Sequence, residues 1–600
     1  MIRLVLDSIA AGYEQDIREL VQAFYPGEEF EIRTPEGVHF SNTTQEEKNA
    51  LKQAQATGEV TTVNKKSTKN RARMVSEVTP EGMEEDSIRL SFTVEAAALP
   101  LTGVRKEDKS VIKSELYDTL VGMTGKELPW GDLTGIRPVS LVSPLLEALP
   151  GHTFPEEALE KIRADLRQEY CIRGEKLDLM VDIAVREQRI LDRILETTGR
   201  SYKEGWSLYI GIPFCPTRCL YCSFLSNTID AWGKRLGDYM ENLRKELRFT
   251  VQYMCGELHR PLQTIYIGGG TPTALDEHWL QVLMDLVHEI SGEANVSILR
   301  DSLPSSENGR SCACATSEAL TDDAAWMHTV TGMPGIVEFT VEAGRPDSIT
   351  REKLEILKVA GVDRISVNPQ TFCQKTLDLI GRKHSVEEVI EKYRLARELG
   401  FENINMDIIL GLPGEKLPEV THTLSEIGRL RPDSLTVHSL AIKRAARLTL
   451  ERDFWAGVYR AGDEHEILAE TQQQEHADGA DFRYPEITRM MLASEYTAEL
   501  LGMKPYYLYR QKNMAGNLEN VGYCEEGKEC LYNILMMEEK HTVVGCGAGT
   551  STKVVLPSRD GDLYHKRVER CDNGKSIPDY LDHIDKFIER KRSLFALFED

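Results

Sequence analysis

One stretch of the chain decides its fold: Ser207-Leu-Tyr-Ile-Gly-Ile-Pro-Phe214-Cys215-Pro-Thr-Arg-Cys219-Leu-Tyr-Cys222. Its first half is a short apolar run typical of a buried strand. The run ends directly in three cysteines with the spacing C-x3-C-x2-C. Three thiolates this close can hold a soft metal ion or an iron–sulfur cluster and leave one coordination position free of protein. A zinc site is the weaker interpretation, because closed zinc sites usually pair two C-x2-C knuckles.

Five more apolar strands follow the first and alternate with helix-patterned segments such as 236–254 and 348–360. After the strand at 207–214, we expect strands at Thr264–Gly270, Val337–Ala343, Arg364–Gln370, Asn405–Leu410 and Ser434–Leu440. This alternation predicts an α/β fold with parallel strands, as a partial barrel or an open doubly wound sheet. In both architectures, ligands bind at the carboxyl ends of the strands.

Polar or small residues stand where these strands end. The second strand ends in the glycine run Gly268–Gly270 and Thr271, and the next three end in Glu342, Gln370 and Asp407. Glycines allow a ligand to approach the backbone closely, and a buried acid needs a partner. Each of these residues alone could be a structural group, but together on successive strand ends they favour a ligand site.

The regions on either side of the barrel differ from it in pattern. We expect an N-terminal α+β domain over residues 1–200, the barrel over 201–440 and a mainly helical C-terminal domain over 441–600. Within the barrel, residues 293–335 lack clear periodicity and interrupt what should be a short connection. We therefore predict a flexible insertion there.

Composition excludes several classes of function. Lys and Arg number 72 and Asp and Glu 96, so the net charge is −24, which disfavours nucleic acid and anionic membranes as partners. Asp7, Glu14 and Asp16 interrupt the start of the chain, which lacks the features of a secretory signal. No apolar run reaches the length of a membrane span. These features predict a cytoplasmic protein.

The strand, cysteine triplet and β/α repeat together resemble the radical S-adenosylmethionine (SAM) superfamily, whose members fold as a partial (β/α)6 barrel. Within it, the chain resembles the oxygen-independent coproporphyrinogen III dehydrogenase family, and most of all its HemZ-like branch. The resemblance rests on Tyr209–Cys215, Gly268–Thr273, Arg364–Gln370, Ile380–His384 and Asn405–Gly414 in the barrel, and on Leu128–Pro138 and Tyr506–Asn517 outside it.

This resemblance implies cofactors and site residues. Cys215, Cys219 and Cys222 would ligate three irons of a [4Fe–4S] cluster, while SAM chelates the fourth. The residues implied to contact the cofactor are Tyr209, Phe224, Gly269, Gly270, Thr271, Glu342, Gln370, Arg382 and Asp407. The reaction would form a 5′-deoxyadenosyl radical that takes hydrogen from coproporphyrinogen III propionates, and loss of CO2 and one electron from each would leave vinyl groups in protoporphyrinogen IX. A flavodoxin or ferredoxin would supply the electron. Cationic side chains suit a substrate with four propionates, and Arg137 and Arg510 are candidates.

Two alternatives remain open at this point. The dehydrogenases carry a further Cys two positions after the third ligand, whereas this chain has Phe224, as the related heme chaperones do. The chain could therefore be a heme-binding or heme-transfer protein, with His541 or Cys546 as a heme ligand. A third possibility is a radical enzyme that acts on heme itself.

Overall fold

The computed structural model describes residues 2–25, 28–40, 75–78, 90–134, 137–198, 201–222, 227–302, 333, 335–441, 486–511, 518–557 and 567–599. These residues form two compact units, one of residues 1–136 with 155–179 and one of residues 137–154 with 180–600. The three predicted domains, with boundaries after residues 200 and 440, stay a prediction.

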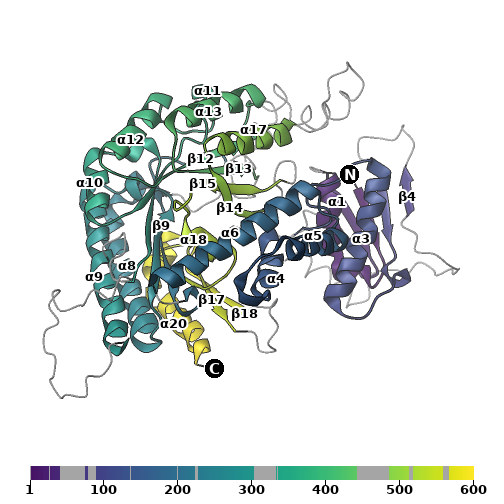
Figure 1. Ribbon diagram of the computed structural model, residues 1–600, viewed down its shortest axis with the longest axis horizontal. Coiled ribbons are helices and arrows are strands. Elements are labelled where there is room, and N and C mark those ends of the chain that lie inside the picture. The colour runs from purple at the N-terminus through teal and green to yellow at the C-terminus, as the bar shows by residue number, and fades with distance from the viewer. Residues whose placement is uncertain are drawn as a thin grey trace. The chain divides into compact units, whose positions relative to one another are not determined.

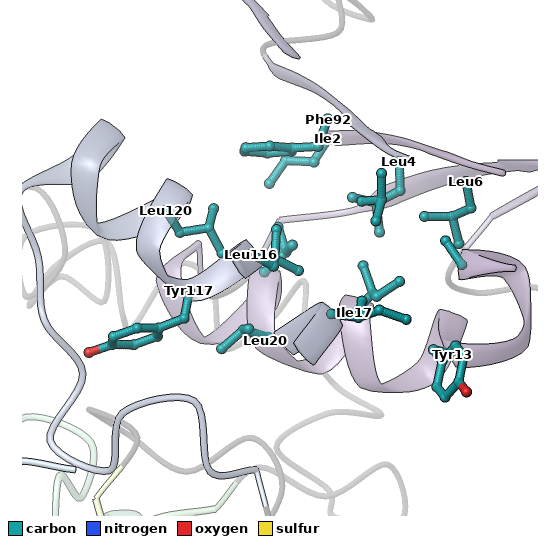
Figure 2. Close-up of a cluster of buried hydrophobic side chains, with 14 of the residues drawn as sticks. Ile2, Leu4, Leu6, Tyr13, Ile17, Leu20, Phe92, Leu116, Tyr117 and Leu120 are labelled. Carbon is teal, nitrogen blue, oxygen red and sulfur yellow. The ribbon is translucent and has the colours of Figure 1, made fainter. Parts of the chain in front are cut away.

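The smaller unit is built on a five-stranded sheet with the order β3-β2-β1-β5-β4. Its strands are β1 (Ile2–Leu6), β2 (Phe30–Thr34), β3 (Gly37–Phe40), β4 (Val75–Val78) and β5 (Leu90–Val94). Alternate residues of β1 are buried, and they pack on the apolar faces of α1 (Glu14–Phe24) and α3 (Arg105–Thr124) (Figure 2). This unit therefore has its own core, as an α+β layer structure requires.

The larger unit contains an eleven-stranded sheet with the order β14-β15-β13-β12-β11-β10-β9-β6-β16-β17-β18. The six predicted strands are confirmed as β6 (Trp206–Ile212), β9 (Leu262–Gly269), β10 (Glu338–Gly344), β11 (Arg364–Val367), β12 (Ile404–Leu410) and β13 (Ser434–Ser439). Neighbouring strands among these six pair in parallel. Among the described residues the sheet keeps two free edges, β14 and β18, so it is an open, partial barrel.

Helices connect the parallel strands and lie in an arc around the outside of the sheet (Figure 1). They are α8 (Leu236–Val251), α9 (Glu277–Ser302), α10 (Arg351–Val359), α11 (Gln374–Leu379), α12 (Val386–Glu398) and α13 (Leu417–Leu430). The strands are almost continuously buried, as β11 shows with every residue buried, because both faces of a parallel sheet are covered. Their carboxyl ends meet at one edge, called the rim below.

The C-terminal part of the chain adds strands at both edges of the sheet. The strands β14 (Lys504–Tyr509) and β15 (Asn520–Cys524) extend it beyond β13, while β16 (Thr542–Cys546), β17 (Ser551–Leu556) and β18 (Arg567–Asp572) extend it beyond β6. The helices are α17 (Glu486–Leu500), α18 (Leu531–Met537), α19 (Ile577–Asp582) and α20 (Ile584–Phe595). The prediction of a mainly helical C-terminal region missed these strands.

The flexible insertion predicted at residues 293–335 stays a prediction. Helix α9 continues to Ser302, so its first residues are helical and not irregular. Residues 303–332 and 334 lie outside the described residues. Among the described helices, none is long and apolar enough to cross a membrane. Cytoplasmic localisation stays a prediction.

Candidate active site

The three cysteines lie on the loop that follows β6 at the rim. Strand β7 (Phe214–Cys215) carries the first of them, Cys219 is buried and Cys222 is half-buried. Backbone hydrogen bonds fix the loop, because the N–H of Leu220 donates to the carbonyl of Ile380 at 2.9 Å. The loop therefore presents its thiols at the carboxyl end of the first parallel strand, as the sequence predicts.

The environment of these thiols tests whether they could hold a cluster. Burial, with smaller effects of the neighbouring Cys222 and Cys219, raises the pKa of the Cys215 thiol to about 11, although a hydrogen bond with Thr271 lowers it. The three sulfurs thus lie close enough to influence one another. Among the described residues, no three His, Cys, Asp or Glu side chains converge as they would on one metal ion. The donors of the cysteine loop fit a cluster by their chemistry, because all three are the soft thiolates that such clusters require.

The glycine run holds the end of β9 against the cysteine loop. The N–H of Gly270 donates to the carbonyl of Ile212 and that of Thr271 to the carbonyl of Phe214, both at 2.7 Å. A Cβ on Gly270 would lie 2.4 Å from the Phe214 oxygen, and Gly269 has a φ of +108°. The close approach expected for a ligand is therefore made here by the protein's own backbone. Contacts of Gly269, Gly270 and Thr271 with a cofactor stay predictions.

Glu342, near the end of β10, lies in a partly buried cluster with two tyrosines. The hydroxyl of Tyr266 donates to Glu342 Oε1 at 2.6 Å, and the rings of Tyr209 and Tyr266 stack with centroids 6.0 Å apart. Burial raises the pKa of Glu342 to about 7, against the Tyr266 hydrogen bond, which lowers it. A carboxyl group that titrates near neutrality beside an open rim is typical of a functional site. Sequence analysis missed Tyr266, although it shares a strand face with Gly268.

Asp407 is held in the ionised form at the next part of the rim. Burial alone would raise its pKa, but the nearby His438 ring and the hydrogen bond from Asn405 keep the pKa below its usual value. Asn405 Nδ2 donates to Asp407 Oδ1 at 2.7 Å, and His438 Nε2 lies 3.8 Å from Oδ2. His438, on β13, is a second residue that sequence analysis missed.

Gln370 and Arg382 lie beside Asp407. Gln370 has a positive φ of 66°, and its backbone N–H donates to the Asp407 carbonyl at 2.9 Å. Asn368 accepts two hydrogen bonds. Its side-chain oxygen accepts one from the N–H of Asp407 at 3.3 Å, and its backbone carbonyl accepts the other from Arg382 Nη2 at 2.7 Å. Arg382 Nη1 also donates to the hydroxyl of Tyr221, in the cysteine loop, at 3.2 Å. These contacts join the ends of β11 and β12 to the cysteine loop.

The two candidate substrate arginines lie at different edges of the sheet. Arg510 directly follows β14, and the last residue of this strand, Tyr509, pairs with Asn520 of β15. The side-chain oxygen Oδ1 of Asn520 accepts a hydrogen bond from the N–H of Ser439, the last residue of β13. The end of β14 therefore lies at the same edge of the sheet as the end of β13. Arg510 is thus at the rim, where burial lowers its pKa to about 10.

Arg137 instead pairs with Glu539. Glu539 lies three residues before the start of β16, whose first residue pairs with the first residue of β6, so this ion pair lies at the amino edge of the parallel strands. The structure therefore does not bring Arg137 to the rim, because Glu539 holds it at the opposite edge. Phe224 lies outside the described residues.

Comparison with known proteins agrees with this site. Residues 209–427 match the family model described as the radical SAM superfamily, whose members use a [4Fe–4S] cluster and SAM. The cofactor prediction is thereby confirmed at the level of the superfamily. The matched residues include the cysteine loop and the strands from β9 to β12.

Similarity over most of the chain defines the family more narrowly. The chain is 37% identical over 497 residues to the oxygen-independent coproporphyrinogen-III oxidase-like protein HemZ of Bacillus subtilis, which covers 82% of each chain. It is 34% identical over 238 residues to the heme chaperone HemW of the same organism, which covers 40% of this chain and 51% of HemW. The solved structure of coproporphyrinogen III oxidase (HemN) from Escherichia coli matches with 19% identity and a TM-score of 0.42, over 66% of this chain and 72% of that one. The chain belongs to the HemZ family of radical SAM proteins.

Proposed function

We propose that this protein catalyses the oxygen-independent oxidative decarboxylation of coproporphyrinogen III, in which two propionates become vinyl groups and protoporphyrinogen IX is formed. The observation that carries the proposal is the similarity to a coproporphyrinogen-III oxidase-like protein over most of both chains. A reducing partner such as a flavodoxin or ferredoxin would supply the electron. The rim would carry the cofactor site and the substrate site side by side.

The cysteine loop would hold three irons of the cluster through Cys215, Cys219 and Cys222. When bound and reduced, the cluster and SAM together supply a 5′-deoxyadenosyl radical that can take hydrogen from an unactivated carbon. Glu342, when ionised, would bind the ammonium group of SAM. The hydroxyl of Tyr266 would orient the Glu342 carboxylate through its hydrogen bond. Asp407, which His438 and Asn405 keep ionised, would accept hydrogen bonds from hydroxyl groups of the cofactor.

Arg510 is the residue we propose for substrate binding. A guanidinium binds a carboxylate through paired, charge-assisted hydrogen bonds, which suits a propionate. Arg510 lies at the same edge of the sheet as Asp407 and is 5% exposed, so its charge is little screened by solvent. Arg137 has no place in this proposal, because Glu539 binds it at the other edge.

Heme handling is the second candidate function, and the similarity to HemW favours it. The two heme ligands suggested by the sequence are poorly placed for it. His541 is 2% exposed, with one ring nitrogen 2.6 Å from Ser207 Oγ and the other 2.9 Å from the Tyr202 carbonyl. Cys546 is completely buried and contacts Thr250 and Lys591. A heme-binding function would therefore need another ligand.

Anaerobic turnover of the reconstituted, reduced protein with SAM and coproporphyrinogen III tests the proposal. We expect stepwise conversion of two propionates to vinyl groups, read by mass spectrometry, with one 5′-deoxyadenosine formed per decarboxylation. The matched control is Glu342→Gln, which should retain iron but lose turnover. Formation of 5′-deoxyadenosine without decarboxylation, together with a stable complex when heme replaces the substrate, would overturn the proposal in favour of heme handling.

A further inference from the structure

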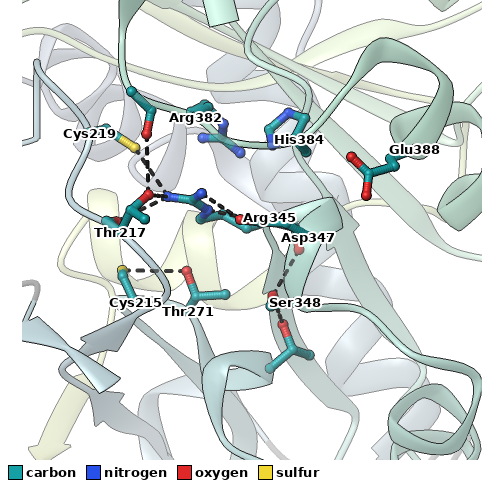
Figure 3. A network of polar contacts seen from close by, with 12 residues as sticks. Cys215, Thr217, Cys219, Thr271, Arg345, Asp347, Ser348, Arg382, His384 and Glu388 are labelled. Carbon is teal, nitrogen blue, oxygen red and sulfur yellow. Dashed lines mark hydrogen bonds and ion pairs between the residues drawn. The ribbon is translucent and has the colours of Figure 1, made fainter. Parts of the chain in front are cut away.

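A buried arginine that the proposed chemistry does not use lies against the cysteine loop. Arg345 follows directly after β10 and is 3% exposed. Its Nη1 donates to the carbonyl of Thr217 at 3.0 Å and to its hydroxyl at 2.7 Å, and lies 3.8 Å from the Sγ of Cys219. Figure 3 shows the guanidinium between this loop and Asp347. One side chain thus contacts both a candidate iron ligand and the segment that leads to it.

The far side of this guanidinium is fixed by Asp347. Nε donates to Oδ1 at 2.9 Å and Nη2 to Oδ2 at 2.6 Å, a two-point ion pair that sets the orientation of the plane. A buried charge is costly to a protein unless it is paired and hydrogen-bonded, and Asp347 supplies that pairing. Because Asp347 occupies Nε and Nη2, Nη1 is aimed at Thr217 and Cys219. The arrangement is rigid, and it directs an N–H group at one sulfur.

The charge around the loop is also uneven. Arg382, a second buried arginine, donates to Tyr221 on the other side of Cys219 and interacts electrostatically with this cysteine. The hydrogen bond of Cys215, by comparison, is with the neutral hydroxyl of Thr271, although Arg345 also acts on this thiol electrostatically. Hydrogen bonds to sulfur and nearby charge are among the main determinants of the potential of an iron–sulfur cluster. A positive charge beside a ligand sulfur favours the reduced cluster, which carries one more negative charge.

We propose that Arg345 is a positioning residue for the cluster: it fixes the Thr217–Cys219 part of the loop and, through its N–H directed at Cys219, raises the reduction potential of the cluster. This inference rests on the three cysteines holding a cluster, and not on which tetrapyrrole the protein acts on. It assigns Arg345 no contact with SAM, because Nε and Nη2 bind Asp347 and Nη1 binds Thr217.

The test is an anaerobic redox titration of the reconstituted protein, followed by electron paramagnetic resonance, without SAM or tetrapyrrole. The variants are Arg345→Gln, Arg345→Lys and a control, Arg351→Gln. Arg351 begins α10, has a 44% exposed side chain and pairs with Glu398 on the outer helices, so its loss should change nothing at the rim. Iron content and SAM affinity are measured on the same samples.

For Arg345→Gln, we expect most of the iron to be retained. At the potential of the wild-type midpoint, the ratio of reduced to oxidised cluster should fall at least tenfold. For a one-electron couple this corresponds to a midpoint that is lower by about 59 mV. Arg345→Lys keeps the charge but cannot make the same set of hydrogen bonds, so its midpoint should lie between the two. Arg351→Gln should titrate like the wild type. An unchanged midpoint combined with weaker SAM binding would overturn the inference and make Arg345 a cofactor-binding residue.

The variant Asp347→Asn keeps the inference falsifiable if Arg345→Gln cannot hold iron. It retains the guanidinium but removes the negative charge that partly neutralises it, so the midpoint should rise above the wild-type value. The two substitutions thus shift the potential in opposite directions, whereas general damage to the loop would shift it in one direction. A fall of the midpoint in Asp347→Asn would refute the electrostatic role. None of these readouts depends on decarboxylation, so they remain valid if the proposed function is wrong.

Discussion

A change of pH from 8 to 6 should weaken SAM binding about tenfold through the titration of one residue, Glu342. Burial raises the pKa of this carboxyl group to about 7. With that pKa, about nine-tenths of the group is ionised at pH 8 and about one-tenth at pH 6. Only the ionised form attracts the ammonium group of SAM, so the association constant should fall with the ionised fraction as the pH decreases through 7.

Calorimetric titration of the reconstituted protein with SAM, under anaerobic conditions at several pH values, measures this effect. The amino group of SAM also titrates, and Glu342→Gln reports that contribution alone. We therefore expect the ratio of wild-type to variant affinity to increase about tenfold between pH 6 and pH 8, with its midpoint near 7. Equal pH profiles of the two proteins would refute the reasoning, since they would show that Glu342 does not change its charge in contact with SAM.

Tyr266→Phe provides an internal check on the cause of this pKa. The Tyr266 hydrogen bond is the largest of the effects that lower the pKa of Glu342, because it stabilises the carboxylate. Its removal should shift the midpoint of the affinity profile to higher pH while the limiting affinity at high pH changes less. A midpoint that stays near 7 would mean that the hydrogen bond does not control the ionisation of Glu342.

Two further substitutions test the scaffold. In the core of the larger unit, the charged groups of Lys591 and Glu246 are fully buried and 2.5 Å apart. Lys591→Met removes the positive charge that compensates the Glu246 carboxylate. It should lower the free energy of unfolding of the larger unit by about 3–5 kcal/mol. Urea denaturation measures this loss, and adding Glu246→Gln should recover part of it; if the double variant is no more stable than the single one, the charge argument is wrong. Gly270→Ala places a Cβ 2.4 Å from the Phe214 oxygen and should reduce the amount of iron retained after reconstitution. In the control Gly292→Ala, no atom lies within 4 Å of the new Cβ, so this variant should retain as much iron as the wild type. Equal iron content in both would show that the close approach at Gly270 is not required.

The parallel strands could be predicted because their sequence signal is local. A strand that is buried along its length carries a high share of apolar residues, as β9 and β12 do with the runs 265–267 and 408–410. The cysteine spacing was equally local, since all three ligands fall within one loop. The residues Glu342 and Asp407 were found by the same logic, as acids within otherwise apolar strand segments, although Asp407 lies in the middle of β12 and not at its end.

The strands of the C-terminal region were missed because their pairing is not local. Strand β16 pairs in parallel with β6, a segment more than three hundred residues earlier in the chain. Strand β17 does alternate between exposed and buried residues, which is the pattern of an antiparallel strand with one covered face, but it was overlooked among charged segments. Sequence spacing could not show which edge of the sheet these strands join.

Partners of the site residues were also beyond prediction. Tyr266, His438 and Arg345 act on Glu342, Asp407 and the cysteine loop only because adjacent strands bring their ends together. Each of the three is an ordinary residue of a strand or strand end in the sequence. Their roles follow from strand order, which no local pattern encodes.

The cysteine strand depends on the C-terminal region for its support. Strand β16 covers the edge of β6, and the hydroxyl of Tyr239 donates to the Gly211 carbonyl at 2.6 Å while accepting from the Ala548 N–H at 3.2 Å. A Cβ on Gly547 would lie 2.4 Å from the same carbonyl oxygen, so the segment after β16 packs directly on the strand four residues before Cys215. Without these contacts β6 would be an open sheet edge, with its backbone groups unpaired at the site where the loop must be held rigid. The C-terminal strands are therefore part of the scaffold of the cluster site, which explains why the barrel and its extension form one compact unit.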